Sequence, residues 1–138
     1  DGPLYVVIGV AVWLAEIPRA EAFCLALILA FAIERPFYFL LKIGLKRNRP
    51  EQVMPSIKAA VVPADQFSFP SGHTSAAFCF ATIAGMLLTG PHNPFFLWAS
   101  AIGLSRIMLA VHFPCDVMAG AIIGSTIATI SAGLVSAL

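Results

Sequence analysis

The sequence has little charge. Of its 138 residues only 11% are Asp, Glu, Lys or Arg, and eight basic against seven acidic side chains leave a formal net charge of +1. A protein that binds nucleic acid needs a basic patch or stripe to meet the phosphates, and neither the charge nor its arrangement supplies one here. We therefore expect no nucleic-acid partner, and the sequence indicates no obligate protein partner.

Cysteine is also scarce. The three cysteines, Cys24, Cys79 and Cys115, are odd in number and do not follow a metal-ligand spacing, so the sequence predicts neither a disulfide framework nor a zinc site. Free cysteine usually behaves as a small apolar side chain inside proteins. We expect all three to be buried in that way.

Apolar residues dominate what remains. Hydrophobic residues make up 59% of the chain, and the mean hydropathy is +0.91, which is typical of a protein that lies in a bilayer. Apolar runs cover residues 3–17, 22–42, 71–88, 94–111 and 114–138, and the first is shorter than the ~20 residues of an ordinary span. No repeat or change of composition marks a domain boundary. The sequence predicts one all-α membrane domain, residues 1–138, as a helical bundle with about five spans.

Three polar motifs interrupt these runs. They are Lys42-x6-Arg49-Pro50, then Pro70-Ser71-Gly72-His73, then Ser105-Arg106-x5-His112-x3-Asp116. An ionisable side chain among hydrocarbon costs several kcal/mol unless it is paired or faces water. Their presence in so apolar a chain indicates a functional site.

Counting membrane crossings places the three motifs together. If the second run ends at Lys42 on one side of the membrane, the polar segment 43–69 stays on that side. The third run then starts there at Ser71, and the fourth returns there at Val111. All three motifs therefore meet at the same membrane face.

Together, and in this order, the motifs resemble the three-part signature of the type 2 phosphatidic acid phosphatase (PAP2) superfamily, in its membrane lipid phosphate phosphatase branch. No motif position is substituted, and the resemblance extends from Lys42 to Asp116. It implies a bundle of six helices, so that five spans here would put the remaining one before Asp1. It also implies a phosphatase.

The second motif has the features of an anion site. Pro70-Ser71-Gly72 directly before an apolar run predicts a helix start with Ser71 as its cap, where free backbone N–H groups and the helix dipole suit a phosphate. Gly72 allows close approach of the backbone. Lys42, Arg49 and Arg106 would add three cations around the same oxygens.

Two histidines and a carboxylate complete the candidate catalytic set. Asp116 follows His112 by four residues, with Pro114 suited to start a helix between them, so a hydrogen bond from Asp116 to the imidazole is expected. Spacing alone shows only that His112 has an orienting carboxylate. The resemblance implies that His112 attacks phosphorus to form a phosphohistidine, and that His73 protonates the leaving oxygen and later activates water.

The expected activity is hydrolysis of the terminal phosphate of a lipid phosphate or diphosphate held among membrane lipids. Phosphatidic acid, phosphatidylglycerol phosphate and polyprenyl diphosphates such as the undecaprenyl carrier are candidates by resemblance. We expect no cofactor and no metal, because the motifs carry cations and no cluster of acidic ligands. The alternatives are a sugar-phosphate phosphatase like glucose-6-phosphatase, and a non-catalytic subunit that binds or transports a lipid phosphate.

Several polar residues lie outside this set. His92, in the turn 90–93, receives no role, and Lys46, Arg47 and Lys58 are interpreted as interfacial cations beside lipid head groups. Glu34 and Arg35 lie inside a predicted span, and adjacent residues of a helix do not face each other. We expect each of them to find another partner or a watery crevice.

Two further expectations concern packing and orientation. Gly120 and Gly124, one turn apart, predict a helix-packing face. The basic residues beside the motifs favour a cytoplasmic site by the positive-inside tendency, whereas the family resemblance favours the opposite face. We expect an integral membrane protein of the cell membrane with an extracytoplasmic site.

Overall fold

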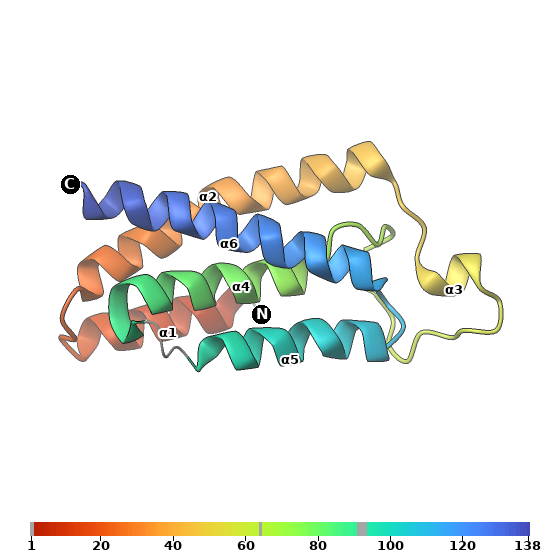
Figure 1. Ribbon diagram of the computed structural model, residues 1–138, viewed down its shortest axis with the longest axis horizontal. Helices are drawn as coiled ribbons and strands as arrows, with labels where there is room; N and C mark the ends of the chain where they lie inside the picture. The colour runs from red at the N-terminus through yellow and green to blue at the C-terminus, as the bar shows by residue number, and fades with distance from the viewer. Residues whose placement is uncertain (1, 64, 91–93) are drawn as a thin grey trace.

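The structure, a computed structural model, describes residues 2–63, 65–90 and 94–138. His92 of the predicted turn lies outside the described residues. Within them the chain is helical and has no strand: α1 (Gly2–Leu14), α2 (Ala20–Leu45), α3 (Pro50–Val53), α4 (Gly72–Ala84), a π-helical turn η1 (Gly85–Thr89), α5 (Phe95–Met108) and α6 (Pro114–Ser136) (Figure 1). The prediction of an all-α membrane bundle is confirmed.

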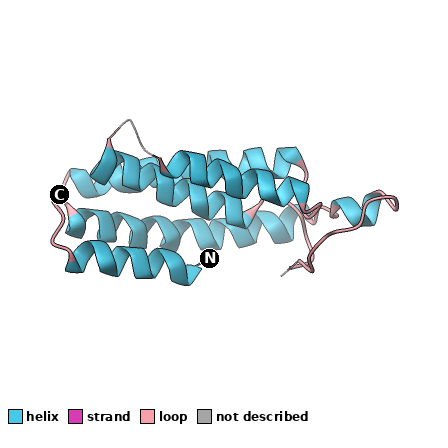
Figure 2. Cartoon of the chain, turned by 90° about the horizontal axis from the view of Figure 1, so that it is seen from below, coloured by secondary structure: helices cyan, strands magenta, loops and turns pink. Residues whose placement is uncertain are grey.

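The five apolar runs correspond to the five longer helices. Three helical segments of the described chain, starting at Ala20, Gly72 and Pro114, are long and apolar enough to cross a membrane, and α1 and α5 are shorter apolar helices. The long helices lie side by side, and α3 projects beyond one end of the bundle (Figures 1 and 2). The short α3, within the polar segment, was not predicted.

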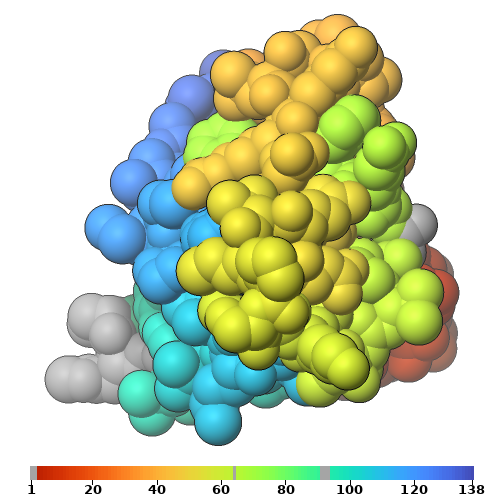
Figure 3. All heavy atoms as spheres, turned by 90° about the vertical axis from the view of Figure 1, so that its right-hand side faces the viewer, coloured from red at the N-terminus to blue at the C-terminus, as the bar shows by residue number. Residues whose placement is uncertain are grey.

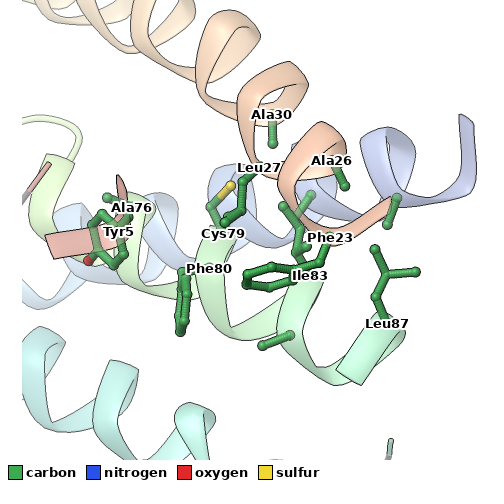
Figure 4. Close-up of a cluster of buried hydrophobic side chains, with 13 residues drawn as sticks. Tyr5, Phe23, Ala26, Leu27, Ala30, Ala76, Cys79, Phe80, Ile83 and Leu87 are labelled. Carbon is green, nitrogen blue, oxygen red and sulfur yellow. The ribbon is translucent and has the colours of Figure 1, made fainter. Parts of the chain in front are cut away.

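Helix α4 is the centre of the bundle and packs against α2, α5 and α6. Its Phe80 is almost fully buried and contacts four aromatic rings, with centroids 5.2 to 6.0 Å away. These rings come from three other helices: Tyr5, Phe23, Phe95 and Trp98. Figure 4 shows Tyr5, Phe23 and Phe80 among the buried hydrophobic side chains around α4. Edge and tilted ring contacts of this kind add to the burial of apolar area and hold α4 in register.

Small residues allow α6 to lie directly on α4. A Cβ added at Gly120 would come within 2.5 Å of the Ser71 carbonyl oxygen, and one at Gly124 would overlap the Ser75 carbonyl. Ala128 and Ala132 continue the same face and are fully buried. The predicted packing face is confirmed, and close backbone contact of this kind is a usual way for membrane helices to associate. It places the start of α6 beside the start of α4.

The cysteines behave less uniformly than expected. All three are free thiols; Cys79 is buried, Cys24 is partly buried and Cys115 is exposed. The prediction for Cys115 is wrong because this residue lies in the first turn of α6 at the end of the bundle, where its side chain faces outward toward Arg47. The segment between α2 and α4 covers much of that end of the molecule (Figure 3).

Candidate active site

The three motifs meet at the end of the bundle where α2 and α5 finish and α4 and α6 begin. A cavity of about 1020 Å³ opens there. Residues of all three motifs line its polar end: Arg49, Gly72, His73, Arg106 and His112. The structure thus brings together the residues that the crossing argument placed on one membrane face.

The two cations of the first motif share one carboxylate. Lys42 and Arg49 are almost fully buried, and Asp65 of the segment before α4 accepts from Lys42 Nζ at 2.6 Å and from Arg49 Nη2 at 2.6 Å. The Tyr38 hydroxyl donates to the same carboxylate at 2.9 Å and accepts from Lys42. Arg49 also donates to the Val111 carbonyl at 2.6 Å, which ties the first motif to the third.

Asp65 was not predicted as part of the site. Its side chain is 38% exposed, so it reaches the buried cations from the rim of the cavity. Burial would raise the pKa of Asp65, but hydrogen bonds from Lys42 and Tyr38 outweigh that effect and hold it below its usual value. The carboxylate is therefore ionised at neutral pH, and it forms ion pairs with Lys42 and Arg49, two of the cations that were expected to bind phosphate.

The second motif forms the predicted helix start. Helix α4 begins at Gly72 with Ser71 as its N-cap residue, but the Ser71 side chain makes no capping bond. Its hydroxyl bonds to the Thr74 hydroxyl at 2.9 Å, and its backbone N–H donates to the Asp116 carbonyl at 3.0 Å. A Cβ at Gly72 would come within 2.8 Å of the Tyr38 ring, so only glycine fits at this wall of the cavity.

Two nitrogen atoms of the third motif are buried without a hydrogen bond in the described part of the chain. They are Arg106 Nε and His112 Nδ1. Buried polar atoms of this kind are rare in folded proteins and often mark a place that a ligand completes. Both residues line the cavity that carries the first two motifs.

The expected hydrogen bond between His112 and Asp116 is not formed. The distance from His112 Nδ1 to Asp116 Oδ2 is 3.9 Å, which is within reach of charge attraction but too long for a hydrogen bond. Instead Oδ2 accepts the Phe113 N–H at 2.8 Å, and Oδ1 accepts from Arg47 at 2.7 Å. Pro114 starts α6 as predicted. The Asp116 carboxylate oxygens are therefore bound to Phe113 at that helix start and to Arg47, and neither is bound to His112.

Arg47 was interpreted as an ordinary interfacial cation, and the structure corrects this. It pairs with the fully buried Asp116 carboxylate and lies 4.6 Å from the centroid of the Phe113 ring. A carboxylate without hydrating water needs a counter-ion, and Arg47 supplies it from the end of α2. The only signal in the sequence is its position between the two cations of the first motif.

The expectation that Glu34 and Arg35 do not face each other is wrong, whereas Arg35 does reach a cavity and Glu34 does find a second partner. Arg35 folds back along α2 and binds both carboxylate oxygens of Glu34 through Nε and Nη2. Glu34 is completely buried and also accepts from the Ser75 hydroxyl of α4 at 2.6 Å. An unpaired carboxylate would be costly at this depth, and the long arginine stem lets adjacent residues pair although their Cβ atoms diverge.

The cavity continues from the motifs into the apolar part of the bundle. Its walls there are side chains of α1 and α2 that repeat at helical spacing: Tyr5, Val6, Val10, Trp13, Leu27, Ile28 and Phe31. From Cys24 to Tyr38 the lining of α2 covers about 20 Å at the rise of an α-helix. A long apolar chain can therefore lie beside α2 while its head reaches the motifs.

His112 lies between the last two helices, and its environment favours the neutral ring. Burial, together with the positive charge of Arg49, lowers the pKa of His112 to about 4, against an opposing hydrogen bond to the Ser68 backbone. A neutral imidazole is the form that can act as a nucleophile or a base. His112 is thus in that form at neutral pH.

Known proteins share both this sequence pattern and this fold. The sequence profile of the PAP2 superfamily matches residues 20–137. The chain is 31% identical over 135 residues to the "Probable lipid phosphate phosphatase beta" of Arabidopsis thaliana, a match that covers 78% of this chain and 63% of that protein. Other curated relatives match over 49% of their length, so the chain spans about half to two thirds of these proteins.

Two solved structures are similar over nearly the whole chain. The crystal structure of LpxE from Aquifex aeolicus has a TM-score of 0.81 and 30% identity, over 95% of this chain and 77% of that one. The first transmembrane PAP2 type phosphatidylglycerolphosphate phosphatase from Bacillus subtilis has a TM-score of 0.72 and 29% identity, over 99% of this chain and 69% of that one.

Proposed function

The chain belongs to the PAP2 superfamily, and we propose that it is a membrane phosphatase that removes the terminal phosphate of a lipid phosphate or diphosphate. One observation carries this proposal: a single cavity has Arg49, His73, Arg106 and His112 at its polar end and apolar helix faces along the rest of its length. A sugar phosphate would have no use for the apolar walls. Relatives that are lipid phosphatases support the same substrate class.

The proposed reaction starts when the substrate phosphate displaces Asp65. Its oxygens take the place of the carboxylate on Lys42 and Arg49, and they also meet the unpaired Arg106 Nε. Three cations and the start of α4 then stabilise the charge that develops on the transferring phosphoryl group. This is the main demand of phosphoryl transfer.

His112 is the proposed nucleophile and His73 the proposed acid and base. The neutral His112 ring forms a bond to phosphorus as the bond from phosphorus to the lipid oxygen breaks, and His73 gives that oxygen a proton. Water activated by His73 then attacks the phosphohistidine and releases inorganic phosphate. Asp116, 3.9 Å from His112, stabilises the positive ring that forms.

We propose that residues 1–138 form a single domain and that its reaction needs no metal. The described residues contain no group of three or more His, Cys, Asp or Glu side chains able to hold a metal ion. The charge that a metal supplies in other phosphatases would come here from Lys42, Arg49 and Arg106.

Phosphate release from lipid phosphates in detergent tests this proposal. We expect turnover that survives excess EDTA and falls with orthovanadate, because five-coordinate vanadate resembles the transition state. His112→Ala should abolish turnover in a protein that stays folded, and brief labelling of the wild type should trap an acid-labile phosphoprotein. Loss of activity in EDTA with recovery in magnesium, or full activity of His112→Ala, would each contradict the mechanism.

The proposed face is extracytoplasmic, and a cysteine at Ser56 can test it. Ser56 is exposed in the segment between α3 and α4. Cys115 is also exposed at this end, so Cys115→Ser must be part of the background. An impermeant thiol reagent should label Ser56→Cys in intact cells. Protection until the membrane is opened would place the site in the cytoplasm.

A further inference from the structure

Arg35 is a cation of the cavity that none of the three motifs contains. It lines the cavity together with His73 and Arg106, and its side chain is 41% exposed there. By contrast its partner Glu34 is completely buried. A pair that served only to join two helices would have no reason to leave the arginine open to the cavity.

The hydrogen bonds of Arg35 leave one side of the guanidinium available. Nε and Nη2 bind Glu34, and Nη2 also lies 3.5 Å from the Gly72 carbonyl oxygen. Nη1 donates to no described residue. Glu34 therefore acts as a clamp that fixes the guanidinium plane, and the remaining edge can bind an anion in the cavity.

Arg35 and Lys42 lie around the same aromatic ring. Arg35 Cζ is 5.0 Å from the centroid of Tyr38, and Lys42 Nζ is 4.5 Å from it. The spacing 35, 38, 42 puts all three residues on one face of α2. Arg35 is thus two turns farther from the end of the helix than Lys42, on the side from which the lipid tail would come.

Building on the proposed function, we propose that Arg35, held by Glu34, binds a second anionic group of the substrate, the phosphate that stays on the lipid after hydrolysis. Lys42, Arg49 and Arg106 hold the phosphate that leaves, and Arg35 holds the next anion toward the tail. This subsite favours lipid diphosphates over monophosphates with the same tail.

Farnesyl diphosphate and farnesyl monophosphate, compared in non-ionic detergent without phospholipid, test the proposal. Glu34→Gln with Arg35→Gln removes both charges and leaves no buried carboxylate unpaired. In this double variant we expect the ratio of kcat/KM for the diphosphate to kcat/KM for the monophosphate to fall about tenfold, because KM for the diphosphate rises. A tenfold change is about the effect of losing one charge-assisted hydrogen bond. Arg35→Lys should fall between this variant and the wild type.

The matched control is Lys58→Gln, which removes a positive charge from an exposed position at the same end, outside the cavity lining. It should leave the ratio unchanged. If the double variant hydrolysed both substrates more slowly by the same factor, the Glu34–Arg35 pair would have only a structural role, and the proposal would be overturned. If added phosphatidylglycerol stimulated hydrolysis of the monophosphate only when Arg35 is present, Arg35 would bind a neighbouring anionic lipid. That result would also overturn the proposal.

A binding measurement keeps this test separate from catalysis. Methylenediphosphonate, which cannot be hydrolysed, should raise the Tm of the wild type more than inorganic phosphate does, and the difference should vanish in the double variant. An equal effect of the two anions on the wild type would refute the subsite even if the protein proved inactive. Inactivity toward both farnesyl substrates, with the Tm difference present, would instead contradict the proposed phosphatase function.

Discussion

Two aspartates lie at the same end of the bundle and are held in different ways. Asp116 is completely buried at the start of α6, where its side chain accepts a backbone N–H and its own carbonyl accepts the Ser71 N–H. Asp65 is 38% exposed in the segment between α3 and α4, and its carboxylate is held by Lys42, Arg49 and Tyr38 side chains.

The difference indicates which carboxylate a substrate can replace. Asp116 is part of a helix start, so removing it from its place would also disturb the contact between α4 and α6. Asp65 depends mainly on cations, and a phosphate with more negative charge can compete for them. The segment that carries Asp65 also carries Ser68, whose backbone forms a hydrogen bond with His112. In the proposed mechanism, both contacts are released before a phosphate reaches His112.

Of the substitutions at the two aspartates, Asp116→Asn should produce the larger effect on activity. The amide cannot balance the charge of Arg47 or stabilise a positive His112, so we expect kcat to fall at least about a hundredfold with little change in KM. Phosphate-release kinetics measure this. Arg47→Gln, which keeps the carboxylate near His112 but removes its counter-ion, should cost much less. A loss under about threefold in Asp116→Asn would remove the carboxylate from the mechanism.

Asp65→Asn should have a smaller effect in the opposite direction. Without the competing carboxylate, orthovanadate should inhibit about five- to tenfold more tightly and KM should fall, because Lys42 and Arg49 are left for the ligand. Glu51→Gln is the matched control, since Glu51 lies in the neighbouring helix α3 and accepts only an exposed backbone N–H. Weaker inhibition in Asp65→Asn would mean that Asp65 orients the cations instead of competing for them.

The sequence was sufficient where local signals decide the structure. Proline at the first turn places the start of α6 at Pro114, and the glycines at 120 and 124 predict a helix-packing face, which the structure shows against α4. The alternation of apolar runs and polar breaks places the motifs on one face. These features depend on residues that are close together in the chain.

The partners of the buried charges could not be read from the sequence. Asp65 reaches Lys42 and Arg49, and Arg47 reaches Asp116, only because an irregular segment without periodicity folds over the end of the bundle. The pairing of Glu34 with Arg35 depends on how deeply α2 is buried against α4. In each case the cost of an unpaired buried charge selects the partner after the helices have packed.

The smallest predicted effect is electrostatic and links Asp65 to His112. Burial and Arg49 lower the pKa of His112 to about 4, while the negative charge of Asp65 raises it. Removing that charge in Asp65→Asn should therefore lower the pKa further, by a fraction of a unit. The unfolded chain takes up this proton at higher pH than the folded protein, so folding stability should fall as the pH drops from 6.5 toward 4.

An NMR titration of the imidazole signals measures this shift directly. The chain has only three histidines, and the signal that is missing from His112→Ala identifies His112. It should stay in the neutral form from pH 8 down to about 5.5 in the wild type, and its inflection in Asp65→Asn should lie at lower pH. Glu51→Gln should leave the inflection in place. If the His112 inflection stayed near 6.5 in the wild type, the ring would be open to water and Asp65 would be too well screened to matter.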